Sequence, residues 1–121
     1  MNKSLRIAWS KAPDSAEYRA AETYLSLVYP PRLAIEIVKR LRAAATTEFA
    51  ARDILRASGR SLLGIKDSDE ERNNLLNGDK ISPLLLVRDD RLTQVIVADG
   101  YHQLCTIYLC NESEMVRCRI V

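Results

Sequence analysis

Residues 97–104, with the sequence VADGYHQL, combine the residue types that can hold a negatively charged ligand. The apolar residues up to Ala98 predict a buried strand, and the glycine and polar residues that follow predict that a helix begins within two or three residues. Such a junction directs unpaired main-chain amides and the positive end of the helix dipole at one point, which favours an anion. This stretch is therefore the first candidate for a binding site.

Three residues of this stretch have distinct chemical roles open to them. Gly100 permits a positive φ or a close approach of a ligand to the backbone. His102, in the first turn of the helix, can donate to a phosphate oxygen, and Asp99 can cap the helix or face the cation of a metal–nucleotide complex. The same residues also have a purely structural interpretation, in which Asp99 caps the helix, Gly100 makes the turn and His102 lies on the surface.

Two amphipathic helices are predicted in residues 1–45, after a short apolar stretch at residues 5–9 that predicts an edge strand. Asp14 and Glu17 have the spacing of a capping box, which begins the first helix. The proline pair at residues 30–31 ends that helix and suits the first turn of the second. Apolar residues recur at helical spacing in both helices: Ala21, Tyr24, Leu25 and Val28 in the first, and Ala34, Ile37, Val38 and Leu41 in the second. The aromatic side chains of this part could pack in the core or form a surface for self-association: Trp9, Tyr18, Tyr24 and Tyr29.

Strands and short helices alternate in the rest of the chain. Strands are predicted at residues 46–51, 84–87, 94–98 and 116–120. The second of these is continuously apolar, as expected of a strand that is covered on both faces. Three helices complete the pattern. The first is capped by Asp53 and closed by Ser58 and Gly59, and the last begins at Gly100. Between them, a polar helix runs from the Ser68–Glu71 capping box to near Gly78, and only Leu75 and Leu76 anchor it.

The predicted fold class is therefore α+β, or mixed α/β, with a small mixed sheet. A length of 121 residues suits one domain, and no linker composition divides it. We expect a single domain over residues 1–121, with a helical part at 1–45 and a core at 46–121.

Charge and cysteine usage narrow the class of protein. The chain has 18 basic and 16 acidic residues, a balance without the basic excess typical of nucleic-acid binders. No secretory signal and no membrane-spanning apolar run is recognisable, so a cytoplasmic location is expected. Cys105, Cys110 and Cys118 are then expected to be buried, reduced thiols, with a Cys105–Cys118 disulfide or a metal site as the alternative. A single histidine and the lack of a C-x-x-C pair argue against zinc.

The order of features at residues 49–54, 80–87 and 98–102 resembles the ParB/sulfiredoxin superfamily, and residues 115–121 stand where the closing strand of that fold is found. The resemblance covers residues 46–121. The whole chain is more closely similar to small stand-alone bacterial proteins of uncharacterised function that carry a D-G-Y-H-R-type helix start.

The resemblance implies a nucleotide site, because this helix start receives the phosphates of CTP in ParB proteins and of ATP in sulfiredoxins. Gly100 and His102 match the motif, and Ser82 with Pro83 matches the loop that lines the nucleotide. Gln103 stands where the motif arginine is usual, and a neutral amide cannot replace a bidentate guanidinium. Tyr101 stands where sulfiredoxins have their reactive cysteine, so sulfinic-acid reduction is not expected. DNA binding by this chain alone is not expected either, since the helix-turn-helix domain of ParB proteins does not follow.

Three functions are compatible with this sequence. The chain is a module that binds a nucleotide, CTP or ATP with Mg²⁺, or another phosphate ligand; or an interaction protein that keeps the fold without the ligand, with self-association through the N-terminal helices; or, third, a nucleotide hydrolase, kinase or nuclease. No metal site of its own is expected. The candidate phosphate- or nucleotide-binding residues are Ser82, Pro83, Asp99, Gly100, Tyr101, His102 and Gln103.

Overall fold

A mixed sheet forms the centre of the protein. The computed structural model describes residues 6–60 and 69–121. Within them lies a four-stranded sheet in the order β1-β4-β2-β3. Two neighbouring pairs, β1 with β4 and β2 with β3, are antiparallel, whereas β2 and β4 run parallel. The strands are β1 (Thr47–Ala50), β2 (Leu84–Asp89), β3 (Gln94–Asp99) and β4 (Met115–Ile120).

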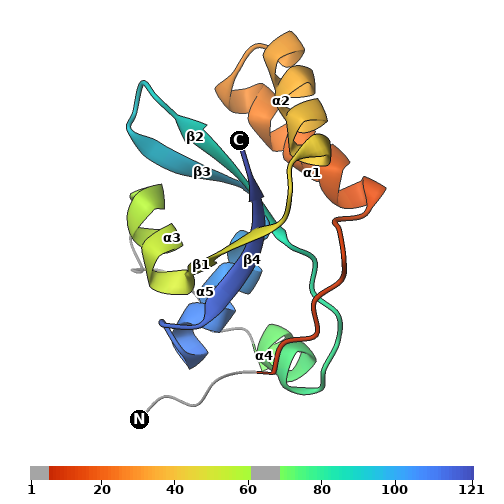
Figure 1. Cartoon of the computed structure of the whole chain (residues 1–121), viewed down its shortest axis with the longest axis vertical. Coiled ribbons are helices and arrows are strands. Elements are labelled where there is room, and N and C mark those ends of the chain that lie inside the picture. Colours follow the sequence, from red (N-terminus) through yellow and green to blue (C-terminus); the bar gives the residue numbers. More distant parts are fainter. Residues whose placement is uncertain (1–5, 61–68) are drawn as a thin grey trace.

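Helices cover both faces of this sheet, as Figure 1 shows. On one face lie α1 (Ser15–Val28) and α2 (Pro31–Ala43). On the other lie α3 (Ala51–Ser58) and α5 (Tyr101–Cys110), with α4 (Asp69–Leu76) beside α5. The predicted α+β fold with a small mixed sheet behind two N-terminal helices is confirmed.

The N-terminal helix pair begins as its sequence predicts. The Asp14 carboxylate accepts from the amide of Glu17 at 2.9 Å, and the Glu17 carboxylate accepts from the amide of Asp14 at 3.1 Å. This reciprocal capping box satisfies two amides that a helix start otherwise leaves unpaired. Pro31 is the first residue of α2, where its missing amide is not needed.

The core under α1 and α2 differs from the predicted stripe in one respect. Tyr18 is buried, whereas Tyr24 is half-buried and Val28 is exposed. Tyr24 and Val28 lie on one flank of α1, because the helix turns residues 18, 21 and 25 towards the sheet. The buried members of this core are Tyr18, Ala21, Leu25, Ala34, Ile37, Val38, Leu41, Leu85, Val87 and Ala98.

A second core fills the space under α3, α4 and α5. Leu84 and Leu86 of β2 point into it, while Leu85 and Val87 point into the first core. The apolar run is thus buried on both faces, as predicted. The buried members of this second core are Ala51, Ile54, Leu55, Leu75, Leu84, Leu86, Leu104, Ile107, Val116 and Cys118.

The predicted strand at residues 5–9 is wrong for its described part. Residues 6–8 form no strand, and the segment makes a single parallel bridge, between Trp9 and Ile81. The amide of Ile81 donates to Ala8 at 2.8 Å, and the amide of Ser10 donates back to Ile81 at 2.8 Å. The next amide of such a ladder would come from residue 83, which is a proline and has none. The pairing therefore stops after one bridge.

The prediction that Asp53 caps α3 is also wrong, since α3 begins at Ala51 and Asp53 lies in its first turn. No side chain caps this helix. The amides of Ala51 and Arg52 instead donate at 2.9 Å to the carbonyls of Glu114 and Glu112, in the loop before β4. A long-range main-chain contact thus replaces the local cap. Gly59 ends the helix with a φ of 67°, as its position predicts.

Other predictions have mixed outcomes. Ser68 lies outside the described residues, so the second capping box has no structural account. Of the two leucines predicted to anchor α4, Leu75 is buried and Leu76 is 63% exposed. None of the three cysteines, all of which lie in the described part of the chain, forms a disulfide; Cys105 and Cys118 are buried and Cys110 is half-buried. Across residues 6–60 and 69–121, none of the helices combines the length and apolar character needed to cross a bilayer.

Candidate functional site

The start of α5 depends on Gly100. This residue is the N-cap, with a φ of 97°, in the left-handed region that favours glycine. A Cβ atom at this position would lie 2.7 Å from Cγ of Leu84, which is buried beneath it. Both the backbone conformation and the packing therefore require glycine.

Asp99 does not cap α5, which corrects one of its two predicted roles. It is the last residue of β3 and pairs with Leu85, and the cap position falls on Gly100. No side chain caps this helix start. Because the glycine adopts a positive φ, the carboxylate one residue earlier does not reach the first amides of the helix.

The amides at the start of α5 are consequently free donors. The first helical hydrogen bond runs from the amide of Leu104 to the carbonyl of Gly100, at 3.0 Å. Among the described residues, no acceptor contacts the amides of residues 101–103. Unpaired amides and the helix dipole together give this end of α5 a positive electrostatic potential.

A pocket of about 300 Å³ opens at this helix start, and we call it the Gly100 pocket. Its wall combines the α5 start with the beginning of α1, the end of α4 and the loop that precedes β2. The residues that line it are Asp14, Glu17, Asn74, Leu75, Asp79, Lys80, Ile81, Ser82, Gly100 and Gln103.

The structure brings some of the seven predicted site residues to this pocket and not others. Ser82, Gly100 and Gln103 line it. Pro83 is fully buried next to it, and Asp99 is half-buried behind the glycine. The other two point elsewhere. Tyr101 lies under the guanidinium of Arg60, whose Cζ is 5.2 Å from the ring centroid, and His102 is exposed and outside the pocket lining.

A hydrogen-bond chain ties the pocket wall together. The Ser82 hydroxyl donates to the Glu17 carboxylate at 2.5 Å, and the Ser10 hydroxyl donates to Ser82 at 3.2 Å. Glu17 therefore serves the capping box of α1 and the loop before β2 at once. This arrangement fixes the N-terminal segment, the first helix and the loop before β2 relative to one another.

The electrostatics of the pocket are not those of a simple anion site. Asp14, Glu17 and Asp79 contribute three carboxylates, and Lys80 contributes the one ammonium of the lining. The carboxylate of Asp99, which precedes Gly100 at the end of β3, adds to this negative charge although it does not line the pocket. Burial and, to a smaller extent, the carboxylates of Glu17 and Asp14 together raise the pKa of Asp99 to about 6.

Sequence reasoning missed most of this wall, since only Ser82, Gly100 and Gln103 of its lining were predicted. Asp14 and Glu17 were recognisable only as a capping box, and nothing local links Glu17 to Ser82, which lies 65 positions further along the chain. Asn74 and Asp79 carried no signal, and Lys80 only marked the beginning of the stretch at residues 80–87, because side chains on a polar helix end and loop are usually solvated. The contact between distant segments alone makes them part of a site.

Two further searches bear on this site. Over residues 6–60 and 69–121, no group of three or more histidine, cysteine, aspartate or glutamate side chains is placed to hold a metal ion. Comparisons with protein-family models, curated proteins and solved structures gave no match.

Proposed function

We propose that the protein is a binding module for a nucleotide and that the Gly100 pocket receives the nucleotide's phosphates together with Mg²⁺. The observation that carries this proposal is the opening of a pocket of about 300 Å³ onto the uncapped start of α5. Free amides, the ammonium of Lys80 and the side-chain amide of Gln103 supply donors for phosphate oxygens. The resemblance to ParB proteins and sulfiredoxins supports CTP or ATP as the nucleotide.

The carboxylates of the pocket explain why the ligand should arrive with its cation. A bare phosphate would meet three lining carboxylates against one ammonium, and Coulomb repulsion would oppose its binding. Proteins usually bind Mg²⁺ through one or two carboxylates plus the substrate's phosphates. Asp14 and Asp79 can provide these ligands, so that the cation is shared between ligand and protein.

Thermal unfolding with and without ligand tests the proposal. We expect CTP or ATP at millimolar concentration to raise Tm in the presence of Mg²⁺ and to have no effect with EDTA, because only a ligand that prefers the folded state stabilises it. Lys80→Ala should reduce the shift, and Gln103→Arg should increase it by adding a charged fork. Lys39→Ala, an exposed lysine on α2, is the matched control.

The outcomes separate the functions that the sequence left open. An absent Tm shift with every nucleotide and Mg²⁺ would overturn the proposal. A shift that Lys80→Ala and Gln103→Arg leave unchanged would place the ligand elsewhere. Release of inorganic phosphate over time would show that the site is that of a hydrolase rather than a binding module.

Exposed aliphatic side chains on the helix pair favour self-association as a second candidate function. Leu27 of α1 is 84% exposed and Ile35 of α2 is 45% exposed. The predicted aromatic surface is not the basis for this candidate, because Tyr18 is buried and Trp9 and Tyr29 are half-buried. A Leu27→Glu variant should then lower the mass measured by light scattering, and a monomeric parent protein would exclude the candidate.

The cytoplasm is the proposed location of this module. Its three cysteines form no disulfide, and cysteines that stay reduced are typical of a reducing compartment. Nucleoside triphosphates and Mg²⁺ are both abundant there, which agrees with the proposed ligand.

A further inference from the structure

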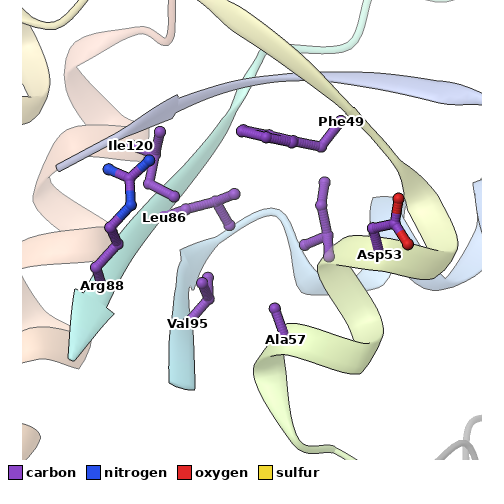
Figure 2. A pocket seen from close by; sticks show the side chains of 8 residues that line it. Phe49, Asp53, Ala57, Leu86, Arg88, Val95 and Ile120 are labelled. Carbon is purple, nitrogen blue, oxygen red and sulfur yellow. The ribbon is translucent and has the colours of Figure 1, made fainter. Parts of the chain in front are cut away.

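A second pocket lies between α3 and the sheet. Its volume is about 250 Å³, and we call it the α3 pocket. Strands β1, β2, β3 and β4 form its floor and one wall, and α3 forms the other wall (Figure 2). The lining residues are Phe49, Asp53, Ile54, Ala57, Leu86, Arg88, Val95 and Ile120.

The α3 pocket exists because small or displaced side chains stand where larger ones would close it. Ala57, in the last turn of α3, contributes only a methyl group to the wall. Phe49 belongs to β1, which is an edge of the sheet, and its ring remains 39% exposed. Leu86, Val95 and Ile120 form an apolar floor, in which Leu86 is buried and the other two side chains are half-buried.

A cationic and an anionic side chain lie at opposite ends of the rim of this apolar pocket. Arg88 is two residues from Leu86 on the same strand face, so its guanidinium stands at one end of the floor. Figure 2 shows Asp53 at the opposite end. Asp53 has a cationic neighbour in Arg56, at 3.9 Å. Among the described residues, no carboxylate or other acceptor contacts the Arg88 side chain.

We propose that the α3 pocket binds a small organic acid with an apolar body, whose carboxylate pairs with Arg88. Apolar residues with one convergent charged group are the usual composition of a small-molecule site. A volume of about 250 Å³ lies below the roughly 300–1,000 Å³ of pockets for drug-sized ligands, which fits a short aliphatic or a single-ring acid. Asp53 repels a carboxylate from the opposite end, so that the acid enters in one orientation.

This site is separate from the Gly100 pocket, because the two pockets share no lining residue. Its occupant also differs in chemistry. The α3 pocket offers an apolar floor and a cation, whereas the Gly100 pocket is polar and carries three carboxylates. Binding of a ligand in the α3 pocket therefore does not depend on binding of a nucleotide in the Gly100 pocket.

Titration of the ¹⁵N-labelled full chain with sodium hexanoate, followed by heteronuclear NMR, tests the proposal. We expect saturable shifts of the amides around the pocket, with 1-hexanol binding about tenfold more weakly because it lacks the charge-assisted hydrogen bond. Arg88→Gln should weaken hexanoate about tenfold and leave 1-hexanol unchanged. Ala57→Leu fills the pocket from an exposed helix position and should abolish both. Arg40→Gln, on α2, is the matched control.

Each result either supports or overturns binding of an organic acid in the α3 pocket. The spectrum of each variant without ligand first establishes that it is folded. No saturable shift with hexanoate up to about 10 mM, shifts confined to residues outside the pocket, or equal affinities of hexanoate and 1-hexanol would each overturn the proposal. So would an Arg88→Gln variant that binds hexanoate as the parent does. Loss of both ligands in Ala57→Leu, with charge selectivity lost in Arg88→Gln, would establish it.

Discussion

Replacement of Asp99 by asparagine is expected to stabilise the folded protein at neutral pH and to have little effect in acid. The side chain is half-buried at the end of β3, and no hydrogen bond from a described residue reaches its carboxylate. Burial, together with the charges of Glu17 and Asp14, raises its pKa from 3.8 to about 6. The ionised form is thus the unfavourable one, and asparagine removes it while keeping the shape of the side chain.

The sign and size of the effect follow from proton linkage. Between pH 3.8 and about 6 the folded state binds a proton more tightly than the unfolded state, so the stability due to Asp99 falls as the pH rises. Above about 6 the loss is complete. The full pKa difference corresponds to about 3 kcal/mol, but water screens a half-exposed group. We therefore expect Asp99→Asn to gain about 1 kcal/mol above pH 7 and nothing below pH 4.

Urea unfolding of both proteins between pH 4 and 7.5 measures this difference. Glu36→Gln, an exposed carboxylate on α2, is the control and should change the free energy of unfolding by less than about 0.5 kcal/mol at every pH. A destabilised Asp99→Asn at pH 7.5 would show that the carboxylate makes a favourable interaction. A gain that does not vary with pH would show that ionisation is not its cause.

Three other outcomes are expected. Gly100→Ala should lower the free energy of unfolding by about 3 kcal/mol in the same urea assay, since both the positive φ and the contact with Leu84 oppose a Cβ. Gly78 has a φ of 80° and open space around it, so Gly78→Ala should lower the free energy of unfolding by only about 1 kcal/mol. At pH 8 under native conditions, Cys118 should resist iodoacetamide while half-buried Cys110 reacts, because burial raises the pKa of the Cys118 thiol to about 11. Mass spectrometry of the alkylated protein measures both reactions. Mg²⁺–ATP should shrink the stability gain of Asp99→Asn, because a bound cation offsets the charge that asparagine removes.

Most of the fold could be predicted because its signals are local. Pro31 and the capping box at Asp14 mark helix boundaries through the chemistry of one or two amides, and the run at residues 84–87 reports burial on both faces. The errors arose where a distant segment supplied what the local sequence lacked. The start of α3 takes its acceptors from the loop before β4, and the pairing at Trp9 ends because of Pro83.

Only the part of the candidate site at the start of α5 could be predicted from the sequence. Gly100 was found because a glycine between a strand and a helix has a local physical reason, and the structure confirms its positive φ. The opposite wall comes from Glu17 and from the loop that contains Lys80, which meet it only in the folded chain. Of the two roles predicted for Asp99, the cap is wrong, because the N-cap position falls on Gly100.

The balance of charges in the Gly100 pocket indicates which ligand suits it. Asp14 and Glu17 are held by the amides of the capping box, and Glu17 also accepts from Ser82. Asp99 has no such compensation, so its ionised form is an unfavourable charge that the fold retains at neutral pH. A bare anion at the α5 start would increase this cost, whereas a ligand that carries a divalent cation would offset it. The same carboxylates that weaken a free-phosphate site therefore favour a Mg²⁺–nucleotide.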